Sequence, residues 1–187
     1  MVRAKLGKPF HRPDCYNPME KKILLLGYGN PDREDDGVAW YVLKGVAEGL
    51  SLPSPATPDD PIPSFENKIS FQFMLQLVPE ISETIADHDC VCFVDAHTGE
   101  ITEPVRAIRI NPKFQKSPFT HHLTPYTCLE LADSIYHKKP EGFLVSIRGF
   151  SFQFEEKLTD KTCEYSKIAV ALILDWLKTG EFKEFGI

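Results

Sequence analysis

The chain has 187 residues, of which 42% are hydrophobic and 26% charged, and its formal net charge is −6. This balance is typical of a single soluble domain with a sizeable core, and it provides no basic surface for nucleic acid. The longest apolar run, Ile168 to Leu174, is far shorter than the roughly 20 residues that a membrane span needs.

The N-terminal residues are basic but have no apolar centre, so they do not resemble a secretory signal. We expect a flexible extension at 1–20, followed by a single α/β domain at 21–187. None of the five cysteines has C-x-x-C spacing, and Cys90 and Cys92 would share one face of a buried strand. These features favour reduced thiols and a cytoplasmic protein.

The first half of the domain begins with a continuous apolar run at 23–27, as expected for a strand that is covered on both faces. A roughly helical pattern follows at 36–49. The stretch 51–66 contains five prolines and is expected to be an exposed loop. An alternating pattern predicts a strand at 68–75, and a short helix is predicted at 79–88.

The second half predicts strands at 90–95, 105–110 and 143–150, and helices at 123–138 and 158–178. The complete order is β-α-β-α-β-β-α-β-α. This alternation predicts a three-layer α/β fold: a twisted, mainly parallel sheet of about five strands with helices on both faces.

The turn "GYGNPDREDDG" after the first strand has glycines at 27 and 29, as in a dinucleotide-binding motif. The third glycine of that motif is replaced by Asp32, however, and the acids of the turn would repel a phosphate. A nucleotide site is therefore not favoured here.

Two acids, Asp35 and Asp36, stand where the next helix is expected to begin. One acid suffices to cap the helix, and we assign that role to Asp35. Asp95 closes an apolar strand, and it is either a cap on the next loop or a ligand-binding group. In open α/β sheets, ligands bind at the carboxyl ends of the strands, so neighbouring strands would bring Asp36 and Asp95 together.

His121 and His122 precede a predicted helix. Adjacent histidines are more often solvated or capping than metal-bound. Two carboxylates and an imidazole can nevertheless bind a divalent transition metal ion, with coordination positions left open for substrate or water.

Several segments, in order, resemble the hydrogenase maturation endopeptidases, which process the large-subunit precursor of nickel–iron hydrogenases. "LLLGYGNPDREDDGV" is similar to the opening motif of that family, "QLVPEISETIADHDCVCFVDA" to its second block and "THHLTPYTCLELA" to its third. "IRGFSFQFEEKLTDKT" resembles its entry to the final helix. The resemblance covers about residues 22–178, but the N-terminal extension and the long loop at 51–66 depart from the family pattern.

The resemblance implies a metal-dependent peptidase whose catalytic and metal-binding residues are Asp36, Asp95 and His121, with His122 and His97 as candidate extra ligands. It also implies that nickel is supplied by the precursor, from which a C-terminal extension is removed. Either the metal ion or a carboxylate would activate water. The alternative is a binding or chaperone module for a metalloprotein precursor that does not cleave it. The sequence does not indicate the oligomeric state.

Overall fold

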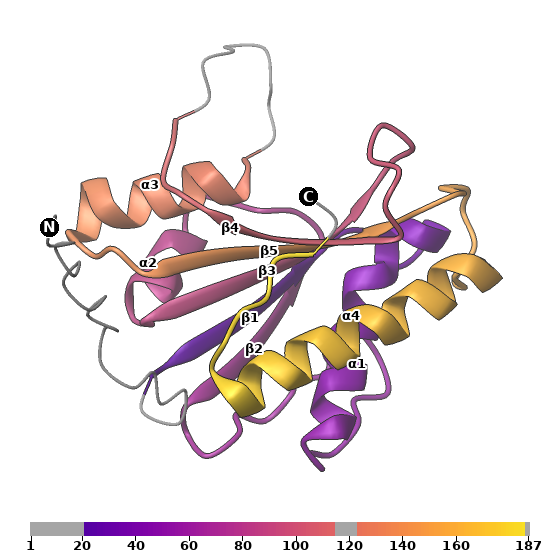
Figure 1. Ribbon diagram of the computed structural model, residues 1–187, viewed down its shortest axis with the longest axis horizontal. Helices are drawn as coiled ribbons and strands as arrows, with labels where there is room; N and C mark the ends of the chain where they lie inside the picture. The colour runs from indigo at the N-terminus through magenta and orange to yellow at the C-terminus, as the bar shows by residue number, and fades with distance from the viewer. Residues whose placement is uncertain (1–20, 115–122, 186–187) are drawn as a thin grey trace, which may run out of the picture.

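The five strands form one sheet in a computed structural model that describes residues 21–114 and 123–185 (Figure 1). The order across the sheet is β2-β1-β3-β5-β4. β2, β1, β3 and β5 run parallel, and β4 is antiparallel to β5. The strands are β1 (Ile23–Tyr28), β2 (Ile69–Met74), β3 (Cys90–His97), β4 (Val105–Ile110) and β5 (Glu141–Arg148). The expected extension at 1–20 lies outside the described residues.

Helices cover both faces of the sheet, which confirms the predicted three-layer α/β fold (Figure 1). α1 and α4 pack on one face, and α2 and α3 pack on the other. The helical elements are the 3-10 turn η2 (Glu34–Gly37) and the helices α1 (Val38–Gly49), α2 (Ile81–Ala86), α3 (Pro125–Tyr136) and α4 (Asp160–Thr179).

The continuous apolar run of β1 is explained by these two layers. Leu25 packs in the core beneath α1 and α4, whereas Leu26 packs in the core beneath α2 and α3. Cys90 and Cys92 share the first of these cores and are fully buried, as the sequence predicts. Burial raises the pKa of the Cys92 thiol, which makes this residue a poor candidate for a nucleophile.

Several strand boundaries differ from the prediction by one or two residues. β5 begins at Glu141 instead of 143, and β3 continues past Asp95 to His97. The two strands pair in register along their whole length, from Cys90 with Glu141 to His97 with Arg148. A charged residue is tolerated at the start of β5 because the Glu141 carboxylate forms ion pairs with Lys21 and Arg109.

The predicted loop at 51–66 is confirmed: it contains neither a helix nor a strand, and most of its residues are exposed. Its last part turns back onto the sheet, where Phe65 and Ile69 exchange two backbone hydrogen bonds. In the part of the chain that the structure describes, no helix has the length and apolar character needed to cross a membrane.

Candidate functional site

Asp36 and Asp95 line one pocket at the carboxyl ends of β1 and β3. Asp36 reaches it from the turn after β1, and Asp95 reaches it from β3 itself. The pocket has a volume of about 400 Å³, and Tyr28, Leu75 and Leu77 are among its other lining residues. The two carboxylates come to one pocket, as expected from the sequence, because β1 and β3 are neighbours in the sheet.

The turn at 29–37 is shaped by close backbone contacts that only glycine permits. Gly29 has φ of 137°, and a Cβ atom there would lie 2.0 Å from the Asp36 carbonyl oxygen. At Gly37, a Cβ atom would lie 2.5 Å from Cα of Pro31. The N–H of Asn30 then donates to Oδ2 of Asp36 at 2.9 Å. The glycines therefore fold the turn back on itself and fix the Asp36 carboxylate.

Asp95 is held by its neighbours in a partly enclosed position. Its Oδ1 accepts the N–H of Ala96 at 2.7 Å, and its carboxyl group is also hydrogen-bonded to the Tyr28 hydroxyl. Burial raises the pKa of Asp95 to about 7; the Tyr28 and Ala96 hydrogen bonds oppose this rise, and the charge of Asp36 adds to it. The charge of Asp36 is thus close enough to disfavour the negative charge of Asp95.

Asp35 does not cap the helix, so that expectation is wrong. α1 has Gly37 at its N-cap and no side-chain capping bond. The fully buried Asp35 carboxylate instead accepts hydrogen bonds of 2.8–3.1 Å from the N–H groups of Phe150, Ser151 and Thr159 and from the Thr159 hydroxyl. Burial opposes its ionisation, but these hydrogen bonds outweigh burial and lower the pKa of Asp35.

The two residues before Asp35 also bind the segment 150–159, which we name the anchor loop. Glu34 donates its N–H to the Glu155 carbonyl at 2.8 Å and accepts the N–H of Gln153 at 3.0 Å. It does so with φ of 45°, a strained conformation for this residue. The Arg33 guanidinium donates to the Phe152 carbonyl at 3.2 Å. Sequence reasoning missed this role, and its one signal was a turn with more acids than a helix cap can use.

The histidine candidates have different outcomes. His121 and His122 lie outside the described residues. His97 is buried, and both of its ring nitrogens have protein partners: the Ser146 hydroxyl at 3.0 Å and the Glu103 carbonyl at 2.9 Å. Within residues 21–114 and 123–185, no three His, Cys, Asp or Glu side chains gather closely enough to hold a metal ion. His97 therefore does not join Asp36 and Asp95.

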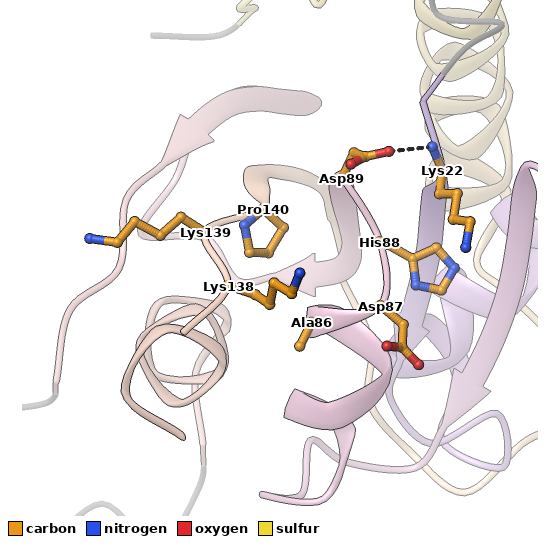
Figure 2. Close-up of a pocket in the computed structure, with 8 residues that line it drawn as sticks. All are labelled: Lys22, Ala86, Asp87, His88, Asp89, Lys138, Lys139 and Pro140. Carbon is orange, nitrogen blue, oxygen red and sulfur yellow. Dashed lines mark hydrogen bonds between the residues drawn. The ribbon is translucent and has the colours of Figure 1, made fainter. Parts of the chain in front are cut away.

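A hollow of about 500 Å³ lies at the other end of the strands, before the starts of β1, β3 and β5 (Figure 2). Several of its polar side chains already have partners in the fold. The Asp89 carboxylate accepts the N–H of Lys22 at 2.8 Å, and Lys139, which points away from the hollow in Figure 2, pairs with Asp133 at 3.1 Å. His88 is hydrogen-bonded to the Thr84 carbonyl at 2.7 Å. The Asp36–Asp95 pocket is therefore the stronger candidate site.

Several solved structures of similar fold are described as hydrogenase maturation endopeptidases or proteases. The hydrogenase maturating endopeptidase HybD from E. coli aligns with a TM-score of 0.57 and 20% identity, over 85% of this chain and 93% of that chain. The chain has the fold of the hydrogenase maturation endopeptidases. No family model matches its sequence, and no curated protein does.

Two further hydrogenase maturation endopeptidases show the same likeness. The [NiFe] hydrogenase maturation protease HycI from Thermococcus kodakarensis KOD1 aligns with a TM-score of 0.59 and 22% identity, over 84% of this chain and 94% of that chain. The hydrogenase 2 maturation peptidase from Thaumarchaeota archaeon SCGC_AB-539-E09 aligns with a TM-score of 0.53 and 20% identity, over 84% and 98%. At these identities the likeness establishes the fold alone.

Proposed function

We propose that this protein is an endopeptidase that removes the C-terminal extension of a nickel-loaded nickel–iron hydrogenase large-subunit precursor. The observation that carries the proposal is the meeting of Asp36 and Asp95 in one pocket at the carboxyl edge of the sheet. The fold supports it, since proteins of similar structure are described as hydrogenase maturation proteases.

In this proposal nickel belongs to the substrate and is brought into the pocket by the precursor. Two neighbouring carboxylates suit a divalent cation, because a positive ion between them offsets their mutual repulsion. In the free protein, burial and then the charge of Asp36 disfavour the ionised form of Asp95. His121 would supply the third ligand proposed from the sequence, and the remaining coordination positions would belong to the precursor.

The chemistry asked of the chain is hydrolysis of one peptide bond. Asp36, fixed by the Asn30 N–H, and Asp95, fixed by Ala96 and Tyr28, would hold the metal-bearing end of the precursor in a defined orientation. A carboxylate beside the scissile bond can also accept a proton from the attacking water. The products are the shortened large subunit and the free C-terminal peptide.

The test is the intact mass of a nickel-loaded precursor after incubation with the wild-type protein, Asp36→Ala or Asp95→Ala. We expect the wild type to remove the extension, and each variant to do so at least about a hundredfold more slowly. Asp87→Ala is the matched control, since Asp87 is an exposed acid in the hollow at the other end of the strands. It should process the precursor at the wild-type rate.

Two results would contradict the proposal. One is wild-type processing by Asp36→Ala and Asp95→Ala, which would remove the pocket from the reaction. The other is binding of the precursor without any loss of mass, whether or not nickel is present. The second result would favour the alternative, a module that docks on a metalloprotein precursor without cutting it.

A further inference from the structure

β2 is an edge strand that has backbone groups available for pairing (Figure 1). Along its ladder with β1, the carbonyls of Lys68 and Met74 accept hydrogen bonds from β1 or the residue after it. Main-chain groups alternate in direction along a strand. The N–H and C=O groups of residues 69, 71 and 73 therefore point away from β1. Ile69 is paired with Phe65, but the N–H and C=O groups of Phe71 and Phe73 have no hydrogen-bond partner among the described residues.

The other edge of the sheet is closed by the chain itself. Ala107 of β4 exchanges two backbone hydrogen bonds with Phe185, at 2.8 and 2.9 Å. The N–H of Arg109 donates to the Glu184 carboxylate at 3.0 Å. Proteins usually cover or blunt an edge strand, because unpaired backbone groups invite pairing with another chain. The open stretch at Phe71–Phe73 therefore contrasts with the covered edge at β4.

A groove runs beside this open stretch. One hollow of about 210 Å³ lies between Phe71 and Phe73 of β2 and the proline-rich loop, and Trp40 and Pro58 line it. A second hollow of about 340 Å³ shares Trp40 and Pro58 and extends to Pro31. We name the two together the edge groove. Its aromatic and proline side chains suit an extended peptide that pairs through its backbone and places alternate side chains in pockets.

The charge of the edge groove is of one sign. Its lining includes four carboxylates and no lysine or arginine. The Asp60 carboxylate accepts the N–H groups of Ala56 and Thr57 and so shapes the loop, but it remains an acid at the rim. Complementary potential would favour a peptide with basic side chains. The four acids are Asp32, Asp59, Asp60 and Glu156.

The edge groove leads to the Asp36–Asp95 pocket. β2 ends at Met74, and the next residue, Leu75, lines that pocket and is 64% exposed. Phe73 and Leu75 are only about 7 Å apart along an extended chain. At the other end, Asp32 of the edge groove is followed directly by Arg33, which lines the pocket. A peptide laid along β2 would therefore be directed toward the two carboxylates.

We propose that the β2 edge binds an extended, basic segment of the precursor as an added strand, next to the bond to be cleaved. This inference rests on the proposed function, since that function identifies the partner. The unpaired backbone groups of Phe71 and Phe73 would hydrogen-bond to the segment, and the four acids of the edge groove would favour basic side chains in it.

The first test is amide hydrogen exchange measured by NMR, with a synthetic hexapeptide of alternating valine and lysine as the probe. In the free protein, the Phe71 and Phe73 amides should exchange fast, whereas the Gln72 amide, which faces β1, should exchange slowly. Adding the peptide should protect Phe71 and Phe73. A peptide with N-methyl groups on alternate residues should give no protection. A valine–glutamate peptide should bind at least about tenfold more weakly.

The second test uses the precursor and the double variant Asp59→Lys/Glu156→Lys. We expect KM for the precursor to rise about tenfold while kcat stays at the wild-type value, because the groove binds substrate but contains no reacting group. Glu83→Lys, on the exposed side of α2, is the matched control and should leave both constants unchanged.

The results separate this inference from the proposed function. Protection of Phe71 and Phe73 by the peptide, with a precursor that is never cleaved, would overturn the function but keep the added strand. Normal cleavage with no protection and no rise in KM would overturn the added strand alone. Protection of both amides in the free protein would also overturn it, because the edge would then be covered by this chain or by a second copy.

Discussion

Asp35 and Thr159 are joined by two hydrogen bonds, since the Asp35 carboxylate accepts both the N–H and the hydroxyl of Thr159 at 2.8 Å. Thr159 is the N-cap of α4, and its hydroxyl also accepts the N–H of Thr162. A buried acid that follows the first strand thus holds the start of the last helix. The turn that carries Asp36 depends on this connection.

We predict that Asp35→Ala lowers the free energy of unfolding by about 3 kcal/mol or more, because four donors lose their acceptor. Urea denaturation measures this change. Asp32→Ala is the matched control: Asp32 is exposed in the same turn, and its loss should change stability by less than about 0.5 kcal/mol. Equal stability of the two variants would contradict the role of Asp35.

Asp35 also predicts how the protein responds to acid. Its hydrogen bonds lower its pKa in the folded state, so its contribution to stability is fully present above the unfolded value of about 3.9. That contribution is lost as the pH falls through the folded pKa. Wild-type stability should therefore decrease more steeply than that of Asp35→Ala below about pH 4. Denaturation midpoints measured at several acidic pH values test this difference.

Asp95 predicts the opposite dependence on pH. Its pKa is raised to about 7 by burial, with the charge of Asp36 adding to the effect, so the folded state binds a proton that the unfolded chain releases above about pH 4. Stability should therefore fall as the pH rises from about 4 to about 7.

The variant Asp95→Asn should reduce this fall in stability, because an amide stays neutral. Urea denaturation near pH 4 and near pH 8 should show that the variant gains stability, relative to the wild type, at the higher pH. The variant should still lose precursor processing. Parallel pH profiles for the two proteins would show that Asp95 does not carry the unfavourable charge.

Gly29→Ala should damage the pocket through the backbone. The new methyl group would collide with the Asp36 carbonyl, and the φ of 137° is strained for alanine. We expect a loss of about 2 kcal/mol or more in stability, together with slower processing of the precursor. Gly99→Ala is the control, since the nearest atom to its Cβ would be the flexible end of Arg148 at 3.7 Å. If Gly29→Ala processes precursor normally, the turn does not need this geometry.

The variant His97→Ala tests whether His97 has a structural role or is a metal ligand. It leaves the Ser146 hydroxyl and the Glu103 carbonyl without their buried partner, so stability should fall by about 1–3 kcal/mol. Processing by the protein that remains folded should be unchanged. His121→Ala should show the reverse pattern, with normal stability and lost processing. Equal loss of processing in both variants would return His97 to the list of candidate ligands.

The order of strands and helices could be predicted because it depends on local patterns. The run at 23–27 is apolar because β1 is buried on both faces, and Pro125 stands at the first turn of α3, where proline is favoured. The start of β5 could not be predicted, because Glu141 looks like a loop residue until Lys21 and Arg109 are placed beside it.

The candidate site, like the fold, could be predicted from the sequence only in part. Asp36 and Asp95 could be identified because the first follows an apolar run and the second ends one, and parallel neighbouring strands bring such residues together. The role of Asp35 depends on residues at 150–159, more than a hundred positions later, and no local pattern reports that contact. A helix cap was the natural local interpretation, but the donors that satisfy this fully buried carboxylate come from Phe150, Ser151 and Thr159.

The anchor loop also determines when the turn that carries Asp36 can fold during synthesis of the chain. Arg33, Glu34 and Asp35 are made early, but their partners at 150–159 emerge only when most of the chain has been synthesised. Synthesis at roughly 5–20 residues per second leaves several seconds in which the turn carrying Asp36 lacks its contacts with the anchor loop. A nascent or truncated chain that ends before Thr159 should therefore lack the hydrogen bonds that hold the turn carrying Asp36.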